Sequence, residues 1–264
     1  MTANQPIKIK NALISVSNKT DLDELTKQLI AYKINLISTG GTATYLRKHQ
    51  CEVIDVSTLT GFPEMMDGRV KTLHPLIYAG LLNRPIVDED ILKEYSITNI
   101  DLVIVNLYPF EKIISMDDCN EEMAIENIDI GGPSMIRATA KNFSTKTIVT
   151  NPDNYELLIK ELQKNQGSIS YEVRKSLALK AFGYTANYDA AIWNYFSSSN
   201  LNKNFPDQLP IGLTKKLKLR YGENPHQKAA AYKTTKASSN TLIGSNIHQG
   251  KELSYNNLLD ANAA

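Results

Sequence analysis

The chain has 264 residues, of which 42% are hydrophobic and 22% are charged, as is ordinary for a globular protein. Its 29 basic and 28 acidic residues leave a formal net charge of +1, which argues against nucleic-acid binding and against a polybasic membrane anchor. Two cysteines are too few for a disulfide framework, and the polar N-terminus and the lack of a long apolar run argue against a signal peptide or a membrane span, so we expect a cytoplasmic protein.

Strands and helices alternate along the first half of the chain. Short apolar runs predict strands at residues 12–15, 35–38, 52–56, 101–107 and 145–150. The first predicted helix buries Leu22, Leu25, Leu29 and Ile30 on one face, with Thr20 or Asp21 as its cap. Further helices are predicted at residues 43–48 and 134–140. The alternation predicts an α/β protein with a doubly wound parallel sheet.

The second half of the chain is mostly helical before it changes character. Residues 151–166 predict one helix, and residues 168–196 predict a longer one that Gly183 could break. Its aromatic-rich surface fits either a core or a contact with another subunit or domain. A polar connector that contains Pro206 follows. We therefore expect a core at 1–150, a helical extension at 151–198, a linker at 199–210, and the truncated start of a second domain at 211–264.

Polar turns follow the first two predicted strands. The segment from Ser17 through Asn18 and Lys19 follows the first strand, and the segment Thr39-Gly40-Gly41-Thr42 follows the second. A glycine pair before a helix lets backbone N–H groups approach an anion, although a simple capping turn is the commoner use of such a sequence. Since no GxGxxG follows the first strand, a strict dinucleotide fold is not indicated.

The segment Gly68–Pro75 concentrates two cations, a hydroxyl and an imidazole between a glycine and a proline. Arg69, Lys71 and Thr72 are the residue types that bind a phosphorylated substrate, and a solvated basic turn is the alternative. His74 precedes Pro75, so we interpret it as a residue that fixes the loop.

Two further polar positions follow the strongest strand. Asn106 lies near its carboxyl end, where open α/β sheets bind ligands, and Tyr108 is either part of a site or a buried tyrosine with a satisfied hydroxyl. Asp129 stands between two isoleucines and before a glycine pair, which fits either an acid or base with a shifted pKa or a helix N-cap. Lys141 follows twelve residues later.

The order and spacing of these motifs over about residues 8–198 resemble the inosine-monophosphate cyclohydrolase domain of the bifunctional purine biosynthesis family. That resemblance implies a methylglyoxal-synthase-like α/β fold. Residues 219–227 and 250–257 resemble the opening of the family's second domain, an aminoimidazole carboxamide ribonucleotide formyltransferase. The resemblance implies ring closure of a purine ribonucleotide precursor to inosine monophosphate, without cofactor or metal, in a homodimer. It implies 10-formyltetrahydrofolate only for the second activity, which we expect in the longer protein and not in this chain.

The resemblance also implies roles for individual residues. The catalytic residues would be Lys71, Tyr108, Asp129 and Lys141. The nucleotide-binding residues would be Ser17, Asn18, Lys19, Thr39, Gly40, Gly41, Thr42, Arg69, Thr72, Asn106, Ile130 and Gly131. Lys71 would stabilise or protonate the formyl oxygen, and the division of acid and base work among Lys71, Asp129 and Lys141 stays open. Arg220 and Tyr221 would belong to a partial formyltransferase substrate site.

Two other interpretations stay open. One is a phosphate-eliminating lyase similar to methylglyoxal synthase, which does not account for residues 106–110 or for the C-terminal motifs. The other is a ligand-sensing module, as this fold serves in carbamoyl-phosphate synthetase, which gives the four expected catalytic residues no task. Preference for purine monophosphates over triose phosphates would distinguish the cyclohydrolase from the lyase.

Overall fold

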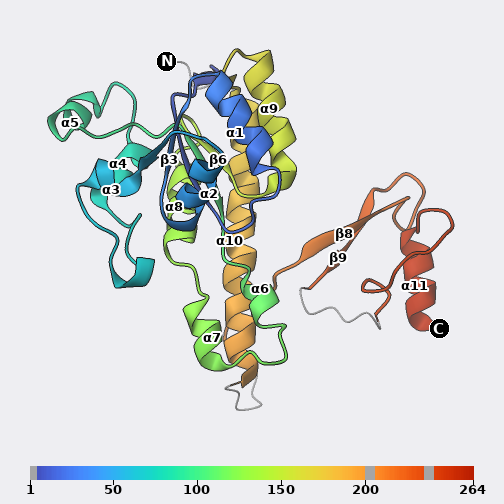
Figure 1. Ribbon diagram of the computed structural model, residues 1–264. Coiled ribbons are helices and arrows are strands. Elements are labelled where there is room, and N and C mark those ends of the chain that lie inside the picture. Colours follow the sequence, from blue (N-terminus) through green and yellow to red (C-terminus); the bar gives the residue numbers. More distant parts are fainter. Residues whose placement is uncertain (1–4, 200–205, 235–240) are drawn as a thin grey trace. The chain divides into compact units, whose positions relative to one another are not determined.

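The computed structural model describes residues 5–199, 206–234 and 241–264 (Figure 1). They form two compact units, one up to Thr185 and one from Ala186 onward, so the division falls within the long helix α10 (Tyr171–Ser199). Residues 200–205 of the expected linker lie outside the described residues. The expected domain boundaries stay a prediction.

A five-stranded parallel sheet forms the centre of the first unit, with the strand order β4-β3-β2-β5-β6. Its strands are β2 (Asn11–Val16), β3 (Asn35–Ser38), β4 (Val53–Asp55), β5 (Leu102–Asn106) and β6 (Thr147–Val149). The order brings β3, β2 and β5 side by side, so the residues that follow these strands meet at one edge. The α/β parallel sheet expected from the sequence is confirmed.

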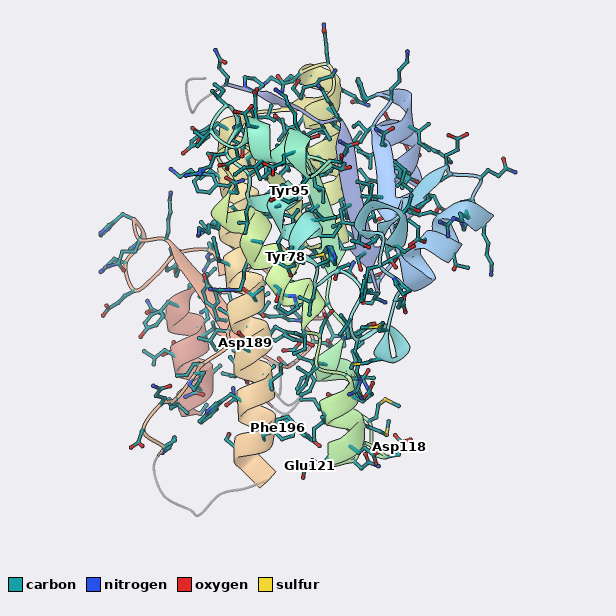
Figure 2. All side chains as sticks on the ribbon, turned by 90° about the vertical axis from the view of Figure 1, so that its left-hand side faces the viewer. Tyr78, Tyr95, Asp118, Glu121, Asp189 and Phe196 are labelled. Carbon is teal, nitrogen blue, oxygen red and sulfur yellow. The ribbon has the colours of Figure 1, made fainter. Side chains whose placement is uncertain are left out.

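Helices cover both faces of this sheet (Figure 1). The helices described in this unit before α10 are α1 (Leu22–Ala31), α2 (Gly40–Lys48), α3 (Val56–Thr60), α4 (Pro75–Leu82), α5 (Glu89–Glu94), α6 (Phe110–Ile113), α7 (Glu121–Glu126), α8 (Gly131–Lys141) and α9 (Tyr155–Lys164), of which α5, α6 and α7 lie away from the sheet (Figure 1). The sequence did not predict α3 to α7. Figure 2 shows Tyr78 on α4, and it shows Asp118 and Glu121 at the beginning of α7. Negative side chains at this end stabilise a helix.

Alternate residues of the strands pack on different helices, as the two-residue period of a strand requires. In β2, Ala12, Ile14 and Val16 belong to one hydrophobic cluster with residues of α1 and α9. On α1 the buried residues are Leu22, Leu25, Thr26 and Leu29, whereas Ile30 is 45% exposed, so its expected place on the buried face was wrong. Helix α8 packs against β5, β6 and α4.

The segment after β6 completes the first unit. Helix α9 joins the cluster of α1 through Leu158 and Leu162, and β7 (Ser168–Ile169) pairs antiparallel with β1 (Ile7–Lys8). Helix α10 runs through Gly183 without a break. The contacts of its buried residues outweigh the cost of about 1 kcal/mol that glycine adds to a helix interior.

The second unit contains a two-stranded antiparallel sheet and a helix. Strands β8 (Thr214–Leu219) and β9 (Ala229–Lys233) pair, and α11 (Tyr255–Ala263) begins with a reciprocal capping box between Ser254 and Asn257. No helix within the described part of the chain is long and apolar enough to cross a membrane.

Candidate active site

The turn after β2 is held by the side chain of Asn106, at the end of β5. Its Oδ1 accepts hydrogen bonds from the Ser17 amide (2.8 Å), the Ser17 hydroxyl (3.0 Å) and the Asn18 amide (2.8 Å). Its Nδ2 donates to the Asn18 carbonyl at 2.9 Å. The amide group of Asn106 is therefore occupied by protein partners, and it shapes the turn.

The turn after β3 is joined by hydrogen bonds to Val16, the last residue of β2. The Thr42 hydroxyl accepts from the Val16 amide at 3.0 Å and donates to the Val16 carbonyl at 3.1 Å. Thr39 is the N-cap of α2 but its side chain makes no capping bond. Among the described residues, none accepts from the N–H groups of Gly40, Gly41 and Thr42. These groups, at the N-terminus of a helix, form a place where an anion binds well.

Lys71 belongs to the segment Gly68–Pro75, which we call the basic loop, and it lies where this loop approaches the turn after β3. Gly40 has φ +54°, and a Cβ on it would lie 3.2 Å from Lys71 Nζ. Gly68 has φ +86°, and a Cβ there would lie 3.3 Å from the same atom. Both glycines therefore permit a backbone conformation and a close approach that other residues would oppose. A carboxylate oxygen of Glu64 lies 4.0 Å from Nζ.

The basic loop also contacts α7 and α8. Arg69 forms an ion pair with Glu126, and both side chains are exposed. Thr72 is buried, and a Cβ on Gly131 would lie 3.0 Å from its hydroxyl oxygen. His74 is the N-cap of α4, where its Nδ1 accepts from the Leu76 amide at 3.2 Å.

Asp129 lies just before α8 and lines the same cavity as Lys71. Its Oδ1 accepts from the Gly132 amide at 2.8 Å, and the backbone amide of Tyr108 also donates to its carboxylate. Burial raises the pKa of Asp129, although these two hydrogen bonds and the charge of Lys71 act in the opposite direction. The N-cap of α8 is Ile130, so the alternative that Asp129 is the cap was wrong, although its carboxylate bonds the first turn of the helix. The raised pKa agrees with the other alternative, and a role as acid or base stays a prediction.

These residues line a cavity of about 510 Å³. Of the expected site residues, those that line it are Ser17, Lys19, Thr39, Gly41, Thr42, Arg69, Lys71, Thr72, Asn106, Tyr108, Asp129, Ile130 and Gly131. Asn18 and Gly40 neighbour the lining without joining it. The cavity is also lined by residues that were not predicted from the sequence, namely Ser15, Val16, Gly68, Ile125, Glu126, Ile128, Gly132 and Met135. No feature of the sequence indicated Glu126, because its ion pair with Arg69 joins two segments that are distant in sequence and meet only in the folded chain.

Asn18 and Lys141 lie apart from the cavity for different reasons. The side-chain oxygen of Asn18 accepts from the amide and hydroxyl of Thr20, at 3.0 and 2.7 Å, so it stabilises the turn. Lys141 is exposed at the last residue of α8. Lys141 lies ten residues along the helix from Gly131, a rise of about 15 Å, and it does not line the cavity. A catalytic role for Lys141 stays a prediction without a contact to support it.

The two C-terminal motifs meet in the second unit. The Arg220 amide donates to the Leu253 carbonyl at 2.8 Å, and the Tyr255 amide donates to the Tyr221 carbonyl at 3.1 Å. The Arg220 guanidinium lies 5.0 Å from the centre of the Tyr221 ring. Within the described residues there is no group of three or more His, Cys, Asp or Glu side chains that could hold a metal ion.

The fold and the site define a protein of the methylglyoxal-synthase-like class. The model of the MGS-like domain family matches residues 21–134, and that of the AICARFT/IMPCHase bienzyme family matches residues 139–264. The solved structure of ForH is similar with a TM-score of 0.64 and 34% identity, covering 71% of this chain and 99% of that one.

Curated relatives give the family. The bifunctional purine biosynthesis protein PurH of Xylella fastidiosa (strain M12) is 50% identical over 269 residues, and that of Xanthomonas campestris pv. campestris (strain 8004) is 48% identical over the same length. Each match covers 99% of this chain and 51% of the relative. The chain spans about half the length of these relatives, and it belongs to the PurH family.

Proposed function

We propose that the first unit is an inosine-monophosphate cyclohydrolase. Its substrate would be 5-formamidoimidazole-4-carboxamide ribonucleotide, a monophosphate whose ring is closed with loss of water. The observation that carries the proposal is the convergence of Lys71, Asp129 and the N-terminus of α2 on one cavity. An anion site, a cation and a carboxylate are what this substrate and this reaction require.

The phosphate of the substrate would bind at the first turn of α2. The N–H groups of Gly41 and Thr42 supply donors, and Lys19 supplies a positive charge from the neighbouring turn. The Lys19 ammonium lies 3.4 Å from the Ser17 carbonyl, which holds it near the turn. Ser17 itself donates its hydroxyl hydrogen within the protein, so its role would be to shape the turn.

The chemistry would follow from Lys71 and Asp129. The carboxamide nitrogen attacks the formyl carbon, and a C–N bond forms within one molecule. The formyl oxygen then leaves as water, with one proton from the carboxamide nitrogen and one from the formamido nitrogen. Lys71 would stabilise the negative charge that develops on the oxygen, and Asp129 would accept the carboxamide proton. Because the reaction is intramolecular, positioning would supply much of the rate.

Four further residues that belong to the site or lie at its edge would contact the substrate. The side chain of Tyr108 is 47% exposed at the cavity, where it would support the oxygen or relay a proton. Arg69 would reach the ligand by exchanging its ion pair with Glu126 for a contact with substrate. Ile130 and Gly131 would contact the base through the start of α8.

The remaining activity of the relatives would need the longer protein. We propose that formyl transfer from 10-formyltetrahydrofolate belongs to that full length, with Arg220 and Tyr221 as part of its substrate site. Cyclisation would need neither folate nor metal, and assembly as a homodimer stays a prediction.

The purified chain can be incubated with the formylated ribonucleotide, without folate or metal, while inosine monophosphate is followed by its absorbance. We expect turnover, and we expect Lys71→Ala to lower it by a factor on the order of 10². The matched control is Lys93→Ala, an exposed lysine on α5 that pairs with Glu89 at 3.8 Å, which should leave turnover unchanged.

The outcomes separate the competing functions. A folded Lys71→Ala protein with normal turnover would remove Lys71 from the mechanism. A wild-type chain that binds triose phosphate and releases inorganic phosphate would favour the lyase. Tight binding of nucleotide without turnover would favour a ligand sensor.

A further inference from the structure

The peptide groups on either side of Leu107 are held from three directions. The carbonyl of Leu107 accepts from the Ser17 hydroxyl at 2.7 Å, and this hydroxyl shares its one hydrogen between Leu107 and Asn106 Oδ1. The amide of Tyr108 donates to the carboxylate of Asp129. The amide of Leu107 donates to the hydroxyl oxygen of Tyr184, on α10, at 3.1 Å. A short segment between β5 and α6 thus links the β2 turn, α8 and α10.

Tyr184 does not line the cavity, whereas Ser17, Tyr108 and Asp129 do. Its hydroxyl reaches the Leu107 amide from α10, and Leu107 is only 3% exposed. Water therefore cannot readily replace the Tyr184 hydroxyl as acceptor, and loss of that oxygen would leave a buried N–H without a partner.

The position of Leu107 determines the position of the next amide. Adjacent peptide groups are joined through a single Cα, so a shift of the Leu107 amide moves the Tyr108 amide that donates to Asp129. Leu107 also packs tightly against the start of α8, since a Cβ on Gly132 would lie 2.5 Å from its Cδ2. The segment has little room to move as long as Tyr184 holds it.

We infer that Tyr184 is a positioning residue, which holds the Leu107–Tyr108 segment so that the Tyr108 amide keeps donating to the carboxylate of Asp129. Tyr184 touches neither substrate nor the reacting atoms. Its effect on the reaction rests on the proposed function, whereas its effect on Leu107 and Asp129 does not.

The test is Tyr184→Phe, which removes only the hydroxyl. The matched control is Tyr155→Phe on α9, because the Tyr155 hydroxyl is also buried but has no hydrogen-bond partner among the described residues and lies outside the cavity. Three quantities would be compared: exchange of the Leu107 amide hydrogen by NMR, the pH titration of the ¹³C-labelled Asp129 carboxyl, and kcat and KM for ring closure.

We expect Leu107 exchange to be faster by about tenfold or more in Tyr184→Phe, with Ile104 in the middle of β5 unchanged. The Asp129 pKa should rise, because an amide that stabilises its charged form is weakened. The value of kcat should fall on the order of tenfold with KM nearly constant. Tyr155→Phe should match the wild type in all three.

Unchanged Leu107 exchange, or an unchanged Asp129 titration, would overturn the inference even if kcat fell. Altered exchange and titration with a normal kcat would also overturn it, since the contact would then not serve the reaction. A wild-type chain that does not close the ring would refute the proposed function, and the exchange and titration would still decide whether Tyr184 holds this segment.

Discussion

Ser17 and Asn106 are joined by two hydrogen bonds to a single oxygen. The Asn106 Oδ1 accepts from the Ser17 amide at 2.8 Å and from the Ser17 hydroxyl at 3.0 Å. Val16 and Asn106 are the last paired residues of β2 and β5. The side chain of Asn106 therefore continues the hydrogen bonding between the two segments beyond the end of the strands. It sets the path of the turn that leads to Lys19.

The first prediction concerns this side chain. Asn106→Asp keeps the shape and the acceptor, but it removes the donor to the Asn18 carbonyl and adds negative charge beneath the expected anion site. We expect the affinity for the nucleotide to fall about tenfold or more, since one buried polar group without its partner costs about 1–3 kcal/mol. Isothermal titration with inosine monophosphate measures the change.

The control for that variant is Asn35→Asp. Asn35 begins β3 at the opposite edge of the sheet, and its side-chain amide donates to the side-chain oxygen of Asn11 at 2.9 Å. Equal losses of affinity in both variants would show that Asn106 has no particular relation to the ligand.

The second prediction follows from the raised pKa of Asp129. Burial is the largest cause, and it disfavours the carboxylate. If Asp129 accepts a proton in the reaction, kcat should rise with pH through a value above the ordinary 3.8 of an aspartate. Asp129→Asn should lower kcat by a factor on the order of 10² and remove that limb of the pH profile. The exposed Asp153→Asn is the control, and it should keep both.

A folded Asp129→Asn protein with an unchanged rate and pH profile would contradict the account. Asp129 would then only bond the first turn of α8.

The third prediction compares two glycines on helices. A Cβ on Gly132 would lie 2.5 Å from Leu107 Cδ2 and 2.7 Å from Asp129 Oδ2, whereas a Cβ on Gly183 would meet nothing within 4 Å. Gly132→Ala should therefore destabilise the protein by about 1–3 kcal/mol and reduce turnover. Gly183→Ala should stabilise α10 by about 0.5–1 kcal/mol. Urea unfolding measures both, and a neutral Gly132→Ala would refute the close packing there.

The fourth prediction concerns stability and Lys146, which is buried at the edge of the sheet opposite the cavity. Its ammonium donates to the Gly80 carbonyl at 2.9 Å and to the side-chain oxygens of Asn83 and Asn99. Burial lowers its pKa to about 8, and nearby Asp101 partly opposes the shift. Between about 8 and the ordinary 10.5, the unfolded chain binds more protons than the folded one.

Stability contributed by Lys146 should therefore rise with pH across that window, by an amount on the order of 3 kcal/mol at most. Urea unfolding at several pH values between 7.5 and 10.5 would be compared for the wild type and Lys146→Met. The variant should lack the rise that the wild type shows. Parallel pH dependences of the two proteins would contradict the expected shift.

The sequence predicted the parallel sheet and the edge where its site lies. The apolar runs of β2 and β5 are continuous, and residues after parallel strands necessarily share an edge, so Ser17, Thr42 and Asn106 could be placed together. Short helices such as α5 lack enough turns for a periodic pattern, and they went unpredicted.

Contacts between distant segments could not be predicted in the same way. The approach of Lys71 to Gly40 depends on the course of a loop without regular structure, and the ion pair of Arg69 with Glu126 depends on where α7 lies. Lys141 illustrates the converse: its motif is close to Asp129 in sequence, but a helix carries it away from the cavity.

The most direct test of the account is a titration of the chain with inosine monophosphate, followed by backbone amide chemical shifts, with inosine and glyceraldehyde 3-phosphate as comparisons. The account predicts saturable shifts at residues 40–42, 69–72 and 129–132, with the shifts at 40–42 lost for inosine, which lacks the phosphate. Saturation with no shift at these three segments, or shifts only in the second unit, would contradict the claim that this cavity is a purine-nucleotide site.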